Sequence, residues 1–241
     1  MKSPAAAVTA AELRGRFAVY GRYYEAELGD CIQGNTAQAK AAPSGLRHAL
    51  RSHLEIVDHT LPWPAVRQQA ADWVVVMMNP GASRPLQAPD AQGWAPALPD
   101  RTQYQLMKLA LRCSPQRAIG HIRVINLSDL RTPQSARLFE LLALLPDDRH
   151  SIFSAARAGE LARALGAPQV PVLCAWGMAK PLAPLANAAL AALGGRTLWG
   201  LHCGGMQYRH PLPQRSDLQQ HWLDDMQAQI ERLSPAVTPE I

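Results

Sequence analysis

The sequence lacks the short motifs that mark several large enzyme classes. It contains no GxxxxGKS or GxxxxGKT phosphate loop, no GxGxxG after its first apolar run, no GxSxG elbow and no HExxH. These absences argue against P-loop nucleotide hydrolysis, ordinary dinucleotide binding, serine hydrolysis and zinc proteolysis. Cysteine is also sparse, and because the 4 cysteines form no CxxC pair we expect reduced thiols, no zinc ribbon and no cofactor.

Long hydrophobic runs are absent as well. No apolar run reaches the roughly 18 residues that span a bilayer, and Glu12 and Arg14 interrupt the N-terminal stretch, which has no leucine-rich signal core. We therefore expect a cytoplasmic protein with no membrane partner. The 241 residues, 48% hydrophobic and 18% charged, suit one ordered domain with an N-terminal elaboration. The net charge of +5 allows a polyanionic partner, but acidic residues are interleaved with the basic ones, so charge carries little weight.

Four strand-like apolar runs separated by helical stretches dominate residues 71–233. Val, Ile and Leu prevail in these runs without polar alternation, as in strands buried on both faces. The pattern predicts an α/β fold with three α/β/α layers around a central four-stranded parallel sheet. Ligands of such sheets bind beyond the carboxyl ends of the strands, so the motifs that follow the runs should gather at one edge. The runs cover residues 73–78, 121–125, 170–175 and 196–201.

The remaining segments are predicted from their spacing and end signals. Residues 1–70 are expected to form an N-terminal elaboration, with a hairpin near 16–28 and a helix over 45–59, where leucines and a valine recur at helical spacing. Residues 234–241 are expected to be a frayed tail. A proline-rich loop of about 20 residues follows Gly81, and long loops of this kind often cover substrates. Helices are predicted over 102–113, 133–145, 151–165, 181–193 and 216–233, the second one capped by Thr132.

An asparagine follows each of the first two runs. Asn79, with Pro80 and Gly81, forms either an ordinary turn or an amide that holds a water or substrate close to the backbone. Asn126 offers one acceptor and two donors, which can read the edge of a nucleobase. The alternative is that Asn126 caps its own loop while Arg131 pairs with Asp129.

The last two runs end in aromatic and histidine-containing motifs. Trp176 serves either to pack the core or to stack on a base. A metal site through His202, Cys203 and His210 is not expected, because the spacing fits no standard site and no carboxylate is near. His210 is then either a surface-loop residue or a hydrogen-bond donor to developing negative charge, with the adjacent Tyr208 and Arg209 contacting a phosphate or a base.

Taken in order, these motifs resemble the uracil-DNA glycosylase superfamily. Its members carry GQDPYH or GINPG, then LLLN, LWG and HPSP, each after a strand. This chain has MNPG at 78–81, VINLSDLRT at 124–132, CAWGMAK at 174–180 and RHPLP at 209–213, so the resemblance covers about residues 70–233. A closer resemblance is to the bacterial and phage family of domain of unknown function 1643, whose members share LNPS, NLF followed by RxT, AWG and a closing HPL.

The resemblance implies a uracil-DNA glycosylase-like fold and hydrolysis of an N-glycosidic bond in DNA or a nucleotide. Asn79 replaces the Asp of GQDPYH, and the fourth motif lacks the serine that grips DNA, so a free nucleotide also stays open. A non-catalytic nucleotide or nucleic-acid binding module, in phage defence or regulation, and an unrelated doubly wound protein are the alternatives. The implied roles are water positioning by Asn79, anion stabilisation by His210, base binding by Asn126, Pro80, Gly81 and Trp176, and phosphate contacts by Arg84, Arg131, Tyr208 and Arg209.

Overall fold

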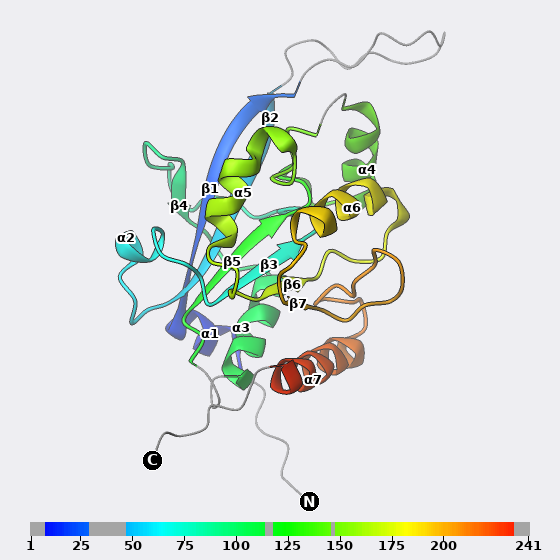
Figure 1. Ribbon diagram of the computed structural model, residues 1–241. Helices are drawn as coiled ribbons and strands as arrows, with labels where there is room; N and C mark the ends of the chain where they lie inside the picture. The colour runs from blue at the N-terminus through cyan, green and yellow to red at the C-terminus, as the bar shows by residue number, and fades with distance from the viewer. Residues whose placement is uncertain (1–7, 29–46, 114–117, 146–147, 234–241) are drawn as a thin grey trace, which may run out of the picture.

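The computed structural model describes residues 8–28, 47–113, 118–145 and 148–233 (Figure 1). The tail predicted at 234–241 lies outside these ranges. Within them, no helix is both long and apolar enough to cross a membrane.

A mixed sheet of seven strands forms the centre of the molecule, in the order β4-β1-β2-β5-β3-β6-β7 (Figure 1). Strands β5, β3, β6 and β7 run parallel to one another and correspond to the four runs seen in the sequence. Strands β2, β1 and β4 extend the sheet with antiparallel pairing, so the prediction of a sheet of four parallel strands was too small. The strands are β1 (Phe17–Glu27), β2 (Arg47–Asp58), β3 (Trp73–Met77), β4 (Trp94–Pro96), β5 (His121–Asn126), β6 (Val172–Cys174) and β7 (Leu198–Trp199).

Strand β2 corrects the prediction of a helix over residues 45–59. The strand lies between β1 and β5 and is buried from residue 50 to residue 58, so its apolar positions do not alternate with exposed polar ones. Without that alternation, the leucine spacing imitated a helix. The buried Glu55 is compensated by ion pairs with His121 and Arg123, both at 2.7 Å. Because β1 and β2 belong to the same sheet as β3, strands from both sides of residue 70, the predicted end of the N-terminal elaboration, form one sheet.

Helices pack on both faces of the sheet. One hydrophobic cluster joins α1, α3 and α7 to one face of the parallel strands, and a second joins α4, α5 and α6 to the other (Figure 1). We call these the α3 face and the α5 face. The helices are α1 (Ala10–Arg16), α2 (Trp63–Val66), α3 (Arg101–Cys113), α4 (Ser135–Leu144), α5 (Ala158–Leu165), α6 (Ala183–Ala192) and α7 (Ser216–Leu233).

The five helices predicted between residues 102 and 233 are confirmed apart from some ends. Helix α4 begins after Gln134 rather than after Thr132, whose hydroxyl donates a hydrogen bond to the Gln134 carbonyl. Helix α5 is shorter than predicted, because residues 155–157 form a 3₁₀ turn before it. It ends at Gly166, whose φ of 62° is the left-handed conformation that glycine adopts without strain.

The long loop after Gly81 is tied to the sheet. Its residues Trp94 to Pro96 form β4, which pairs with β1 at the edge of the sheet. The Ser83 hydroxyl is 3.2 Å from the Tyr23 hydroxyl, and the Ser83 carbonyl accepts a hydrogen bond from Arg131 Nε at 2.9 Å. Through Ser83, the beginning of the loop is held close to the carboxyl ends of the parallel strands.

Candidate functional site

Asn126 ends β5 on the α3 face of the sheet. Ile122 and Val124 belong to the cluster with α3 and α7, and because strand residues alternate between faces, Asn126 points the same way. Asn126 is 0% exposed, and neither Nδ2 nor Oδ1 is hydrogen-bonded within the described part of the chain. Such a buried amide costs about 1–3 kcal/mol if it stays unpaired, so its presence at a strand end marks a binding position.

The structure excludes the purely local interpretation of this loop. The amide of Asn126 caps nothing, since neither of its polar atoms has a partner among the described residues. Asp129 pairs with Arg157 at 2.7 Å, whereas Arg131 donates to the Ser83 carbonyl. The predicted alternative pairing of Arg131 with Asp129 is therefore wrong.

Asn79 follows β3 and uses its amide in a different way. Its Nδ2 donates to the carbonyls of Leu130 and Thr132 at 3.1 and 2.9 Å, which fastens the segment after β5 to the end of β3. Both N–H groups are engaged, so Oδ1 is the atom of this amide that can accept a hydrogen bond from a ligand or a water. Pro80 is buried, and Gly81 turns the chain with a φ of 63°.

His210 lies on the same face as Asn126, in the segment that leads to α7. The Arg209 carbonyl accepts a hydrogen bond from the indole of Trp222, a core residue of α7 on the α3 face. The Leu212 N–H donates to His210 Nδ1 at 3.1 Å, so a neutral ring carries its proton on Nε2. Burial lowers the pKa of His210 from its usual 6.5, which keeps the ring neutral at neutral pH. The side chain is thus a neutral donor through Nε2.

Arg51 and Asp100, neither of which belongs to a motif, complete the site. Arg51 is 3% exposed and lies in β2 directly opposite Tyr23 of β1, a core residue of the α3 face. Asp100 caps α3, and its Oδ1 accepts the Gln103 N–H at 2.9 Å. Burial lowers the pKa of Arg51 to about 10, and the Asp100 carboxylate opposes the effect of burial on both Arg51 and His210. Asp100 therefore lies within electrostatic range of both Arg51 and His210. We call these three groups, together with Asn126 on the same face of the sheet, the carboxyl-edge cluster.

Two of the predicted phosphate contacts lie beside this cluster. Arg131 is half-buried, with its guanidinium 5.1 Å from the centroid of the Tyr23 ring. Burial lowers the pKa of Arg131, and the charge of the exposed Arg84 adds to that effect. The charge of Arg131 also acts on Arg51, so the region around Arg51 carries more than one cation.

Three other predicted residues lie elsewhere. Trp176 is 1% exposed, belongs to the α5-face cluster and donates its indole N–H to the Met206 carbonyl at 2.8 Å. It packs edge-on against Tyr208, with ring centroids 4.9 Å apart. Trp176 is therefore a buried core residue on the α5 face, and Tyr208 packs against it. Arg209 is exposed and lies 3.8 Å from a carboxylate oxygen of Asp225.

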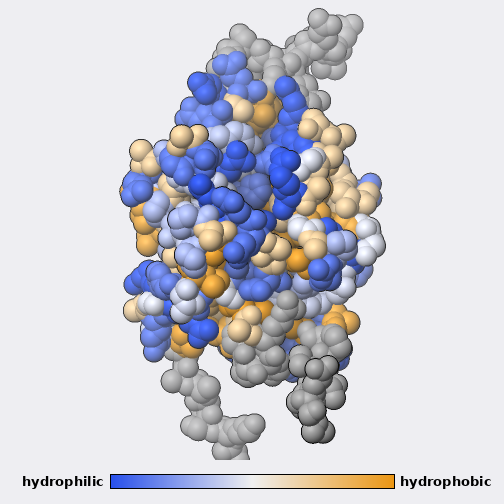
Figure 2. Space-filling model, turned by 60° about the vertical axis from the view of Figure 1, so that its left-hand side comes forward, coloured by the Kyte–Doolittle hydropathy of each residue, from blue (hydrophilic) through white to orange (hydrophobic). Residues whose placement is uncertain are grey.

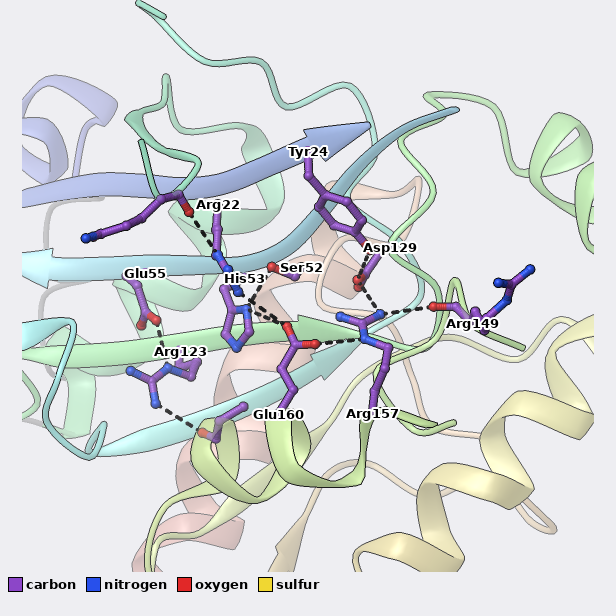
Figure 3. Close-up of polar contacts among 12 residues, drawn as sticks. Arg22, Tyr24, Ser52, His53, Glu55, Arg123, Asp129, Arg149, Arg157 and Glu160 are labelled. Carbon is purple, nitrogen blue, oxygen red and sulfur yellow. Dashed lines mark hydrogen bonds and ion pairs between the residues drawn. The ribbon is translucent and has the colours of Figure 1, made fainter. Parts of the chain in front are cut away.

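A second polar cluster lies on the α5 face (Figure 3). Arg157 binds Asp129 at 2.7 Å and Glu160 at 2.9 Å, and the Tyr24 hydroxyl donates to Asp129 at 2.8 Å. Tyr24, Arg157 and Glu160 line a cleft of about 470 Å³ between β1 and α5, on a side of the molecule that is mostly hydrophilic (Figure 2). Since each charge in this chain of contacts has an opposite charge beside it, the cluster reads as an internal ion-pair network that ties α5 to the sheet.

The predicted absence of a metal site concerns His202, Cys203 and His210. His202 Nε2 lies 2.8 Å from the Gly205 carbonyl, and Cys203 is exposed. No group of three or more His, Cys, Asp or Glu residues in the described ranges is arranged to hold a metal ion.

Arg51 could have been found from the sequence through one signal. An arginine, a serine, a histidine and a glutamate occur between Leu50 and Val57, inside a run whose leucines and isoleucine are otherwise those of a core element. Charged residues in such a run require partners, and buried arginines without them are candidates for ligand contacts.

No family model, curated protein or solved structure matches this chain. The likeness to the glycosylases therefore depends on the four motifs and on where the structure places them.

Proposed function

We propose that the chain recognises a nucleobase at the carboxyl-edge cluster and hydrolyses the N-glycosidic bond of that base, in a three-layer fold of the uracil-DNA glycosylase type. The observation that carries the proposal is the buried amide of Asn126, whose donor and acceptor are both unpaired among the described residues. An adjacent donor and acceptor match the edge of a base, and two such hydrogen bonds contribute about 1–3 kcal/mol of discrimination.

The neutral imidazole of His210 supports the catalytic part of the proposal. When the bond between the sugar and the base breaks, its electron pair leaves with the base, which becomes an anion. A donor already aimed at that anion lowers the barrier without reorganisation, and the loss of one such donor typically costs about 10²–10³ in rate. His210 Nε2 carries the proton for this hydrogen bond, because Nδ1 is occupied by the Leu212 N–H.

Asn79 supplies the acceptor for the water in this mechanism. Its two N–H groups are bound to carbonyls, so its Oδ1 can orient a water whose oxygen then bonds to the sugar carbon while a proton is released to solvent. An amide orients the water but cannot take its proton.

That last property favours the second candidate, a module that binds a base or nucleotide without cleaving it. Asn79 stands where a carboxylate would act as a base, and its hydrogen bonds to Leu130 and Thr132 give it a structural role of its own. In that case the same pocket serves recognition alone, with DNA or a nucleotide as the partner.

The test measures binding and cleavage together. Fluorescent single-stranded and duplex oligonucleotides that carry uracil, a G·T mismatch or an abasic analogue, and free nucleosides, are titrated into the pure protein, and alkali-sensitive cleavage is followed. An enzyme cleaves, and His210→Gln then lowers the rate about 10²-fold while binding is retained. Binding without cleavage supports the module.

A matched pair of variants guards the interpretation. Asn126→Leu should abolish base-dependent binding, whereas His221→Ala, an exposed histidine on α7, should change neither binding nor rate. The proposal fails if base-dependent binding survives in Asn126→Leu or if no base-containing ligand binds at all.

A further inference from the structure

Arg51 is a buried guanidinium that the fold does not pair. It is 3% exposed, and its Nε and Nη1 atoms have no hydrogen-bond partner in the described part of the chain. The side chain leaves β2 on the α3 face, opposite Tyr23 and beside the strand that ends in Asn126. It therefore points its unpaired donors into the carboxyl-edge cluster.

Two other arginines, the buried Arg123 and the partly buried Arg157, show how this fold pairs a guanidinium. Arg123 is 5% exposed and binds Glu55 at 2.7 Å, with a further bond from Nη1 to the Ala164 carbonyl at 3.2 Å. Arg157 binds both Asp129 and Glu160. A buried cation without such partners is strongly unfavourable, so a fold that pairs two arginines and leaves Arg51 unpaired has a position prepared for an external anion.

We propose that Arg51 binds a phosphate group of the ligand whose base Asn126 reads, and that this group is the terminal phosphate of a mononucleotide. The proposal rests on the proposed function and names its substrate class. Guanidinium donors bind phosphate oxygens through charge-assisted hydrogen bonds, which are about twice as strong as neutral ones.

The surrounding charges favour a doubly charged anion. The charge of Arg131 acts on Arg51 as a like charge, so the two cations repel each other through the site. A phosphate monoester with nearly two negative charges neutralises both, whereas a carboxylate or a phosphodiester carries one. Of the carboxylates whose charge reaches Arg51, Asp100 caps α3, and Asp129 binds Arg157 and Tyr24 through Oδ2. Oδ1 of Asp129 is buried without a hydrogen bond among the described residues, so it does not form an ion pair with Arg51.

The burial of Arg51 favours a terminal phosphate over an internal phosphodiester of a nucleic-acid strand. An internal phosphodiester continues into the strand in both directions, and a guanidinium that is 3% exposed leaves little room for two exits. A terminal phosphate is attached to the rest of its ligand on one side and therefore needs only one exit.

The experiment uses the full chain and begins with inorganic phosphate, a probe that needs no knowledge of the base. Thermal unfolding is followed with increasing phosphate, and with sodium chloride at matched ionic strength, in wild type, Arg51→Met and Arg51→Gln. Arg101→Met is the control, because Arg101 is an exposed arginine next to Asp100. We expect phosphate-specific stabilisation in wild type and Arg101→Met, and a loss of phosphate affinity of about tenfold or more in both Arg51 variants.

The second arm compares nucleosides, nucleoside monophosphates and oligonucleotides. We expect a monophosphate to bind wild type about tenfold more tightly than its nucleoside, and Arg51→Met to bind the two with nearly equal affinity. Tighter binding of an oligonucleotide than of the monophosphate overturns the terminal-phosphate assignment. Equal stabilisation by phosphate and chloride, or equal phosphate affinity in wild type and both Arg51 variants, overturns the role of Arg51.

The outcomes separate this inference from the function on which it rests. If no nucleoside binds but phosphate binding depends on Arg51, then Arg51 is an anion site and nucleobase recognition is wrong. If nucleosides bind through Asn126 and phosphate has no effect, nucleobase recognition stands and the phosphate proposal is refuted.

Discussion

Two asparagines at neighbouring strand ends should respond to the same substitution with opposite signs. Asn126 is fully buried with both polar atoms unpaired in the described part of the chain, whereas Asn79 donates two hydrogen bonds to the carbonyls of Leu130 and Thr132. Leucine has nearly the shape of asparagine and no polar atoms. The substitution therefore removes a cost at one position and a stabilising contribution at the other.

The magnitudes follow from these contacts. Asn126→Leu eliminates an unpaired buried amide, which should raise the free energy of unfolding by about 1–3 kcal/mol. Asn79→Leu loses two hydrogen bonds worth about 0.5–1.5 kcal/mol each and leaves two carbonyls unpaired, so stability should fall by about 1–3 kcal/mol. For a chain of this length, each 1 kcal/mol corresponds to about 2–4 °C in the melting temperature.

Urea denaturation at neutral pH, followed by circular dichroism and by tryptophan fluorescence, measures both changes. The comparison of two identical substitutions controls for the general effect of adding an apolar side chain. If Asn126→Leu is destabilised as much as Asn79→Leu, the Asn126 amide forms hydrogen bonds essential to the fold, and its interpretation as a ligand contact is refuted.

Three other predictions concern charge and burial. Burial lowers the pKa of His53 from 6.5 to about 4, so the free energy of unfolding should be highest above pH 6.5 and should fall by about 3 kcal/mol as the pH drops to about 4. Urea midpoints measured over this pH range should fall less steeply in His53→Gln than in wild type. Arg123→Met leaves the buried Glu55 without its guanidinium partner and should lower the free energy of unfolding by about 3–5 kcal/mol. The double variant Arg123→Met, Glu55→Leu should recover part of this loss, and an unchanged urea midpoint in Arg123→Met would contradict a stabilising ion pair. Cys203 is exposed, whereas burial raises the pKa of Cys174 to about 12, so iodoacetamide should alkylate Cys203 before Cys174, as measured by peptide mass spectrometry. Equal alkylation rates would show that the core on the α5 face opens readily.

The parallel half of the fold could be predicted because its signals are local. Each of the four runs is a short stretch of branched residues with a turn motif behind it, and strands with both faces covered need only that pattern. The edge that holds Asn79, Asn126 and His210 followed from the same reasoning. Asn79 and Asn126 stand at neighbouring strand ends because β3 and β5 are parallel neighbours, an arrangement that the alternation of strands and helices implies.

The antiparallel half could not be predicted, because its character depends on distant residues. Strand β2 lies between β1 and β5, and its buried Glu55 is acceptable only because Arg123 and His121 arrive from β5. The same dependence on distant residues concealed Arg51, which lies opposite Tyr23 of β1. Trp176 continues the alternation of Val172 and Cys174 in β6 and so faces α5, on the side opposite Asn126.

The position of β5 in the sheet has a consequence for how this chain reaches its native state during synthesis. Strand β2 has β1 and β5 as neighbours, and β3 has β5 and β6, so the two consecutive strands β2 and β3 are joined only by a strand that is made later. Until His121 to Asn126 have left the ribosome, β2 and β3 each present an open edge toward the position of β5, and such edges are the surfaces through which incomplete sheets associate with one another. The insertion of β5 closes these two edges at once and carries Asn126 into place in the same event, whereas the other edge of β3 stays open until β6 is made. The nascent chain therefore depends on β5 both to join the two halves of the sheet and to assemble the candidate site.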